Sequence, residues 1–140
     1  TMKELSHGAF QAVIDDPRMK TKKASKAADT IIMCTGKIYY DLLEQLDETP
    51  ADNLAFVRFE QLHPFPQANF DSIVDRYGSE ANYIWVQEEP ENMGAWTYIL
   101  WQFPTRLELA SPKASAAPAP GSHQAAHAIH HEAIKKVFSI

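Results

Sequence analysis

Short apolar segments alternate along the chain with longer stretches in which apolar residues recur every three or four positions. The short segments are rich in β-branched and aromatic residues and are bounded by polar or turn-forming residues, so they are predicted to be strands. We expect strands at Thr30 to Thr35, Leu54 to Phe59, Tyr83 to Gln87, Leu107 to Ser111 and, upstream of these, Phe10 to Ile14.

The longer stretches have the spacing of amphipathic helices, in which a single apolar stripe faces the core. One stripe stops at Gly78, a residue type that commonly ends helices. Another forms the C-terminal segment and follows a loop rich in Ala and Pro at residues 114–121. The predicted helical stripes cover residues 38–46, 70–77, 96–103 and 126–138.

The alternation of strands and helices predicts an α/β fold. The segment Ile31 to Cys34 is apolar on both faces, as expected for a central strand that helices cover on each side. Strand, helix and parallel strand in short succession favour right-handed crossovers and a doubly wound sheet. In such sheets the ligand crevice lies beyond the carboxyl ends of the strands.

Length and composition indicate one domain of a soluble protein. The chain has 140 residues, enough for a single core, and its apolar runs are shorter than the ~18 residues of a membrane span. A single cysteine excludes an internal disulfide framework and indicates a reducing, cytoplasm-like compartment. The net charge of −5 argues against nucleic acid as a partner. Thr1 ahead of Met2 suggests a fragment of a longer polypeptide.

A local cluster of basic residues departs from this overall acidity. It lies between Pro17 and the strand that begins at Thr30, and we interpret it as a solvated loop, the usual role of a charge run. A docking surface for an acidic partner is the alternative. The cluster consists of Arg18, Lys20, Lys22, Lys23 and Lys26.

Polar residues follow three of the predicted strands and are expected to meet at one edge of the sheet. They are Gly36-Lys37, Glu60-Gln61 and Gln87-Glu88-Glu89. A helix that begins at Gly36 or Lys37 adds the positive end of its dipole to the lysine ammonium, so a phosphate or carboxylate could bind there. The alternative is that these groups form ion pairs with a neighbouring domain or subunit.

Several familiar chemistries are excluded or disfavoured by the residues. Lys37 is followed by Ile rather than Ser or Thr, so no phosphate-binding P-loop is present, and no glycine cluster marks a dinucleotide site. Cys34 lies in an apolar strand, where a thiol is usually inert. Four histidines near the C-terminus have no evident third metal ligand, and we interpret them as surface residues of a helix: His123, His127, His130 and His131.

Three motifs resemble a known family. They are residues 34–43 (CTGKIYYDLL), 60–66 (EQLHPFP) and 87–96 (QEEPENMGAW), in that order along the chain. Together they resemble the C-terminal domain of the decarboxylase component of 2-oxoglutarate dehydrogenase, and the resemblance covers nearly the whole chain. It implies a transketolase-type C-terminal fold, a three-layer α/β/α sandwich around a five-stranded, mostly parallel sheet. The strand at Phe10 to Ile14 is then expected to run antiparallel.

The resemblance also implies what the parent enzyme does. In the family, thiamin diphosphate and magnesium lie between the two preceding domains of a homodimer. There 2-oxoglutarate is oxidatively decarboxylated in the citric acid cycle, and the succinyl group passes to the lipoyl group of a succinyltransferase component. None of those catalytic motifs occurs in this chain, so the isolated chain is expected to be inactive and to bind no cofactor itself. A preference of the parent for 2-oxoadipate is an alternative.

For this domain the resemblance implies support of the dimer and, in some members, binding of acetyl-coenzyme A as an effector. We expect an effector site at Lys37, Arg58, Gln87 and Lys113, and no metal site. Family members commonly carry Arg where this chain has Pro112-Lys113, so the lysine would replace a guanidinium without its bidentate geometry.

A different class of function remains open: a free-standing α/β module that binds an anionic metabolite. Exposed apolar area discriminates between the two readings, because a domain removed from a larger protein uncovers the surface on which its neighbours packed. Trp96, Tyr98 and Trp101 are the expected members of such a patch.

Overall fold

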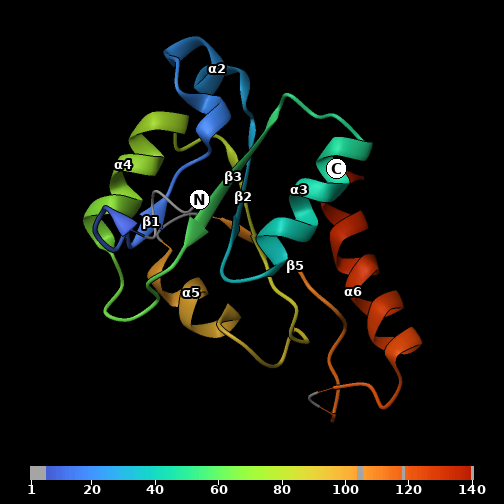
Figure 1. The fold of residues 1–140 in the computed structure, drawn as a ribbon. Helices are drawn as coiled ribbons and strands as arrows, with labels where there is room; N and C mark the ends of the chain where they lie inside the picture. The colour runs from blue at the N-terminus through green and yellow to red at the C-terminus, as the bar shows by residue number, and fades with distance from the viewer. Residues whose placement is uncertain (1–5, 104–105, 118, 140) are drawn as a thin grey trace.

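The fold is built on a five-stranded sheet with the strand order β1-β3-β2-β4-β5 (Figure 1). The computed structural model describes residues 6–103, 106–117 and 119–139. Only β1 runs antiparallel, beside β3, and the remaining neighbours are parallel. The predicted mixed sheet is therefore confirmed. The strands are β1 Val13–Ile14, β2 Thr30–Cys34, β3 Leu54–Phe59, β4 Asn82–Val86 and β5 Leu107–Ala110.

Helices cover both faces of this sheet, which gives the expected three layers. Helices α3 and α6 cover one face, and α4 and α5 cover the other (Figure 1). The helices of the described residues are the short 3-10 helix η1 Pro17–Met19, α2 Lys22–Ala27, α3 Ile38–Glu48, α4 Gln67–Tyr77, α5 Trp96–Gln102 and α6 His123–Phe138. None of them is both long and apolar enough to cross a membrane.

The alternation of side chains along the strands divides the core into two clusters. In β2, Ile31 and Met33 pack toward α4 and α5, whereas Ile32 and Cys34 pack toward α3 and α6. All five residues of β2 are buried, so its apolar run corresponds to a central strand with helices on both faces. The sheet is thereby fixed between two helical layers, and the carboxyl ends of its parallel strands lie together at one edge.

The basic segment is solvated, as its charge predicts, but it is helical rather than a loop. It forms η1 and α2, and Thr21 caps α2 by accepting a hydrogen bond from the Ala24 amide. The four lysines are exposed, but the Arg18 guanidinium donates to the Asp16 carboxylate and to the Leu54 carbonyl. The loop assignment was wrong, because side chains of Asp16 and Thr21 cap two short helices here, and a count of like charges reveals neither these caps nor the pairing of Arg18 with Asp16.

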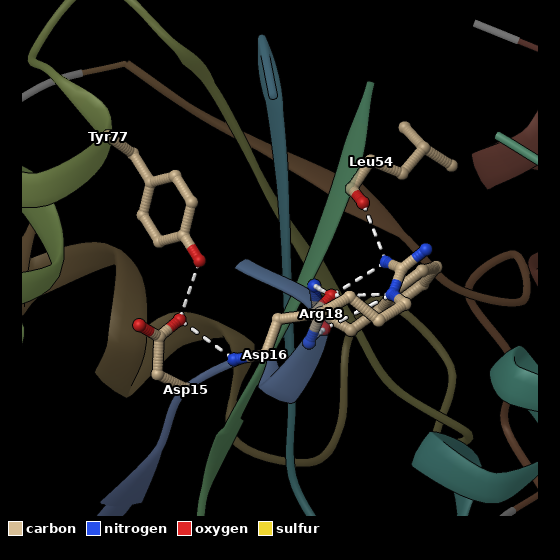
Figure 2. A network of polar contacts seen from close by, with 6 residues as sticks. Asp15, Asp16, Arg18, Leu54 and Tyr77 are labelled. Atoms are coloured by element: carbon tan, nitrogen blue, oxygen red, sulfur yellow. Dashed lines mark hydrogen bonds and ion pairs between the residues drawn. The ribbon is translucent and has the colours of Figure 1, made fainter. Parts of the chain in front are cut away.

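Figure 2 shows the polar network around this segment. Asp16 is buried, and its carboxylate accepts from the backbone amides of Arg18, at 2.8 Å, and Phe56, at 2.9 Å. The neighbouring Asp15 accepts from the Tyr77 hydroxyl at 2.6 Å. Outside the view of the figure, Asp15 also pairs with Arg76 at 3.0 Å. These contacts join the segment after β1 to β3 and to the end of α4, so they fasten the amino-terminal end of the sheet.

Strand β3 has the predicted bounds, and the other strands and predicted helices differ from theirs by one to three residues at an end. Strand β1 contains only Val13 and Ile14 of the expected Phe10 to Ile14, and Phe10 is 72% exposed. Helix α6 begins at His123, before the first residue of its apolar stripe, because the Ser122 side chain caps the helix by accepting from the Ala125 amide.

Candidate functional site

Lys37 lies at the carboxyl end of β2, where the chain turns into α3. Gly36 has a φ of +74°, a backbone conformation that favours glycine and that allows the sharp turn from strand to helix. The Lys37 ammonium is 2.8 Å from the Asp41 carboxylate and 3.8 Å from that of Glu88. The ammonium is therefore held by two carboxylates of the chain itself.

Asp41 connects two helices. Its carboxylate accepts from Lys37, in its own helix α3, and lies 3.0 Å from Nε2 of His130 in α6. Partial burial raises the pKa of Asp41, but the hydrogen bonds from Lys37 and His130 outweigh that effect and leave the pKa below its ordinary value. The same bond to Asp41 raises the pKa of Lys37. Both groups are therefore charged at neutral pH.

Beside this cluster lies a cavity of about 540 Å³. Charged and titratable groups line one part of it, and the exposed side chain of Ile129 contributes to the apolar part. A second cavity, of about 340 Å³, shares Glu88, Pro120 and Ile129 with the first and is lined by Lys113. The polar lining of the first cavity comprises Lys37, Glu88, Glu89, His123, His127 and His130.

Arg58 lies at the carboxyl end of β3 and faces aromatic rings. Its guanidinium lies over the Tyr39 ring, 4.3 Å from the centroid, and 3.4 Å from the Glu60 carboxylate. The Nε atom is buried and has no hydrogen-bond partner in the described part of the chain. Arg58 lines neither of the two cavities.

Gln87, at the end of β4, is buried, and its side chain makes five hydrogen bonds. Its carbonyl oxygen accepts from the Trp85 indole and from the Trp96 amide. Its amide nitrogen donates to the backbone carbonyls of Glu89, Pro90 and Met93. Gln87 thus holds the loop that precedes α5 and fixes where Glu88 and Glu89 lie.

Gly94 packs directly against the Gln87 side chain. A Cβ atom at this position would lie 3.0 Å from the Gln87 amide nitrogen and 3.0 Å from the Glu89 Cβ. Its φ of +71° also favours glycine. The loop therefore depends on the absence of a side chain at residue 94.

The four residues predicted for an effector site gather at one end of the sheet but have different surroundings. Lys37 and Lys113 line adjoining cavities. Arg58 is stacked on aromatic rings, and the Gln87 side chain is hydrogen-bonded to the loop that precedes α5. Asp41 was missed. Its spacing of four residues from Lys37, on the first turn of a helix, is the signal that could have revealed the pair.

The predicted absence of thiol chemistry agrees with the surroundings of Cys34. The side chain is fully buried, and burial raises its pKa to about 12, so the thiol stays protonated at neutral pH. Within the described ranges, no group of three or more His, Cys, Asp and Glu side chains has the geometry of a metal site.

A family model described as "2-oxoglutarate dehydrogenase C-terminal" matches residues 1–138. The chain belongs to this family. It is 38% identical, over an alignment of 145 positions, to the oxoglutarate dehydrogenase of Buchnera aphidicola subsp. Baizongia pistaciae, an alignment that covers 99% of the chain and 15% of that protein. The resemblance inferred from the three motifs is confirmed.

Two further relatives carry the name 2-oxoglutarate dehydrogenase E1 component. The Haemophilus influenzae protein is 38% identical over 127 positions, covering 86% of this chain and 13% of that protein. The Rickettsia conorii protein is 37% identical over 124 positions, covering 82% of this chain and 13% of that protein. The 2-oxoglutarate dehydrogenase C-terminal domain described here thus spans 13–15% of the length of these relatives.

Two of the five large apolar side chains that are exposed among the described residues lie on α5, and the others are Phe10, Tyr40 in α3 and Ile129 in α6. Trp101 is 82% exposed and Leu100 is 41% exposed. The other two residues expected in the patch, Trp96 and Tyr98, are half-buried and pack against the core. The patch is therefore centred on Trp101 and Leu100 rather than on all three predicted aromatic residues.

Proposed function

We propose that the chain is a non-catalytic domain of a 2-oxoglutarate dehydrogenase E1 component and supports the dimer of that enzyme. The observation that carries the proposal is the family match over residues 1–138, combined with relatives that are six to eight times longer. The parent decarboxylates 2-oxoglutarate and passes the succinyl group to the lipoyl carrier of the succinyltransferase component. The rest of the parent performs this chemistry.

Among the described residues, no group of three or more His, Cys, Asp and Glu side chains could hold a magnesium ion. Magnesium prefers carboxylate and water oxygens, yet Glu60 and Glu88 at the carboxyl edge are already paired with Arg58 and Lys37. The buried thiol of Cys34 offers no nucleophile at neutral pH. These surroundings support assignment of the cofactor to the preceding domains.

The exposed side chains of α5 support a role in assembly. A tryptophan as exposed as Trp101, next to the exposed Leu100, is the kind of apolar surface that is buried at interfaces. Cover by the remaining domains of the parent or by the second subunit accounts for both residues. A free-standing metabolite-binding module would leave this surface in water.

Acetyl-coenzyme A binding is a second function, favoured by the two adjoining cavities. Lys37 and Lys113 supply positive charge at separate positions, and Pro120 and Ile129 form an apolar wall common to both cavities. A ligand with several phosphates and a long thioester arm matches charges that are spread along an apolar groove. Lys113 replaces the family's arginine as a point charge.

Turnover by the parent tests the main proposal. The full polypeptide is assayed for 2-oxoglutarate-dependent reduction of ferricyanide, with thiamin diphosphate and magnesium added or withheld, and its subunit state is measured by sedimentation. The same assays follow for a parent with Trp101→Ser and Leu100→Ser. We expect cofactor-dependent turnover and a weakened dimer in the double variant.

Other results would redirect the assignment. Turnover of 2-oxoadipate in place of 2-oxoglutarate would assign the parent to the other substrate. No turnover of either acid would favour the binding module. An unchanged dimer in the double variant would remove α5 from the subunit contact.

The effector proposal is tested by activation of the parent with acetyl-coenzyme A. Lys37→Met and Lys113→Met remove one charge each from the cavities and are expected to raise the concentration for half-activation by about tenfold. Lys26→Met removes an exposed charge on α2 and serves as the matched control. Equal activation of all four proteins would contradict the effector site.

A further inference from the structure

We propose that the cavity beside Lys37 binds the phosphates of its ligand together with protons, which are taken up by histidines of α6. This inference rests on the proposed effector function and concerns the regulation of the same site. It makes anion binding to this domain tighter at slightly acidic pH.

The charges that line the cavity oppose an anion when the histidines are neutral. Glu88 and Glu89 place two carboxylates against the single ammonium of Lys37. Asp41 adds a third carboxylate, 2.8 Å from that ammonium. A phosphate that enters this cavity meets a net negative lining, so its binding requires additional positive charge.

Helix α6 supplies groups that can acquire this charge. His123, His127 and His130 all line the cavity, and their spacing of four and three residues places them on one face of the helix. Histidine is the side chain that changes charge between about pH 5 and pH 8. His131 stacks on His127, with ring centroids 5.9 Å apart, and lies outside the cavity lining.

The contact between α3 and α6 links the protonation of His130 to the availability of Lys37. These helices lie side by side on the same face of the sheet (Figure 1). Asp41 accepts from Lys37 and lies 3.0 Å from His130, so both basic groups use one carboxylate. A protonated His130 neutralises Asp41 and leaves the lysine ammonium free to bind a phosphate.

Calorimetric titration of the full parent, saturated with thiamin diphosphate and magnesium, tests this coupling. Acetyl-coenzyme A and adenosine 3′,5′-bisphosphate are the two titrants, at pH 6 and pH 8, each in two buffers of different ionisation enthalpy. The difference in heat between the buffers counts the protons taken up. Because the phosphates of the titrants also change charge in this range, the count is compared with that of variants.

The variants separate the cavity histidines from the other histidines. His123→Gln, His127→Gln and His130→Gln are combined in one protein, since glutamine keeps the helix propensity and can still donate a hydrogen bond to Asp41 from position 130. His63→Gln, in the loop before α4, is the matched control and contacts Tyr98 rather than the cavity. We expect roughly tenfold tighter binding at pH 6 than at pH 8 in the parent and the control.

Each outcome decides between the two proposals. Proton uptake that exceeds that of the triple variant supports the coupling. Equal uptake in both overturns it and leaves the effector proposal standing. Binding of the bisphosphate with excess protons, but no binding of acetyl-coenzyme A, overturns only the choice of effector. No binding of either titrant at either pH overturns both proposals.

Discussion

Charged residues at the two ends of the central sheet differ in burial and in their hydrogen-bond partners. At the amino-terminal end, Asp16 is buried and satisfied by backbone amides and by Arg18, and the guanidinium also donates to a backbone carbonyl (Figure 2). At the carboxyl-terminal end, Lys37 pairs with carboxylates at a more exposed position beside a cavity. At the amino-terminal end, the charged side chains bind backbone groups of the chain. At the carboxyl-terminal end, the charged side chains stay accessible to solvent.

This difference separates structural from functional uses of the same residue types. A buried charge is stable only when hydrogen bonds replace its water, and the contacts of Asp16 meet that condition with groups that cannot move away. An exposed ion pair such as Lys37 with Asp41 stabilises the fold only slightly and exchanges partners readily. A binding site at the carboxyl end therefore costs the fold little stability.

The largest expected effect comes from breaking the amino-terminal network. Asp16→Ala leaves the Phe56 amide and the Arg18 guanidinium without their buried partner and removes the cap of η1. We expect the free energy of unfolding to fall by about 3 kcal/mol. Urea denaturation followed by tryptophan fluorescence measures the change.

Asp47→Ala is the matched control for that experiment, because Asp47 is exposed on α3. Its effect is expected to stay within about 0.5 kcal/mol. A similar loss from both substitutions would show that the Asp16 network adds nothing beyond an ordinary surface carboxylate, and the contrast between the two ends would then fail.

Gln87 is an exception to the contrast, since it lies at the carboxyl end but is fully satisfied by the chain. Gln87→Leu leaves three backbone carbonyls and two N–H groups without this partner. We expect a loss of about 2 kcal/mol in the free energy of unfolding. Amide hydrogen exchange should also become faster across residues 88–95, because the side chain holds that loop.

Gln124→Leu makes the same replacement at an exposed position of α6 and controls for the change in side-chain type. It is expected to change stability by less than about 0.5 kcal/mol. Exchange in residues 88–95 that is unaffected by Gln87→Leu would assign Gln87 to ligand binding, as the sequence first suggested, rather than to the loop.

Most of the fold follows from local patterns in the sequence. The apolar run of β2 and the stripes of α3 and α4 each specify one element, because periodicity and burial depend on neighbouring residues. The convergence of Lys37, Glu60 and Gln87 at one edge then follows from parallel strands alone. The antiparallel direction of β1 came only from the resemblance to a family.

The remaining features depend on contacts between residues that are distant in the chain. Arg18 binds the carbonyl of Leu54, and Tyr77 binds Asp15, so neither partner is visible from local composition. The pairing of Arg18 in the basic segment was missed for this reason. The contact between His130 and Asp41 is of the same kind. His123 and His127 are exposed on α6, as predicted, and together with His130 they line a cavity that the sequence did not indicate.

The smallest expected effect concerns Asp41, at the carboxyl end. Its pKa lies below the ordinary value in the folded state, so its stabilising contribution is fully present above the unfolded pKa of about 3.9 and is lost as pH falls through the folded pKa. The pKa of Lys37 is raised, so its contribution is present below the unfolded pKa of about 10.4 and is lost as pH rises through the folded value. The ion pair therefore stabilises the fold at pH values between the folded pKa of Asp41 and the folded pKa of Lys37.

Asp41→Asn should remove this contribution without disturbing the helix. We expect the variant to be less stable than the parent sequence by about 0.5 kcal/mol at pH 7, since the pair is partly exposed. The difference should shrink as pH falls through the folded pKa of Asp41, because the protonated carboxyl no longer pairs with Lys37. Urea denaturation at a series of pH values measures it. A difference that stayed the same as pH fell would assign the effect to packing of α3 against α6 rather than to charge, and Asp41 would then resemble Asp16 more than an exchangeable partner of Lys37.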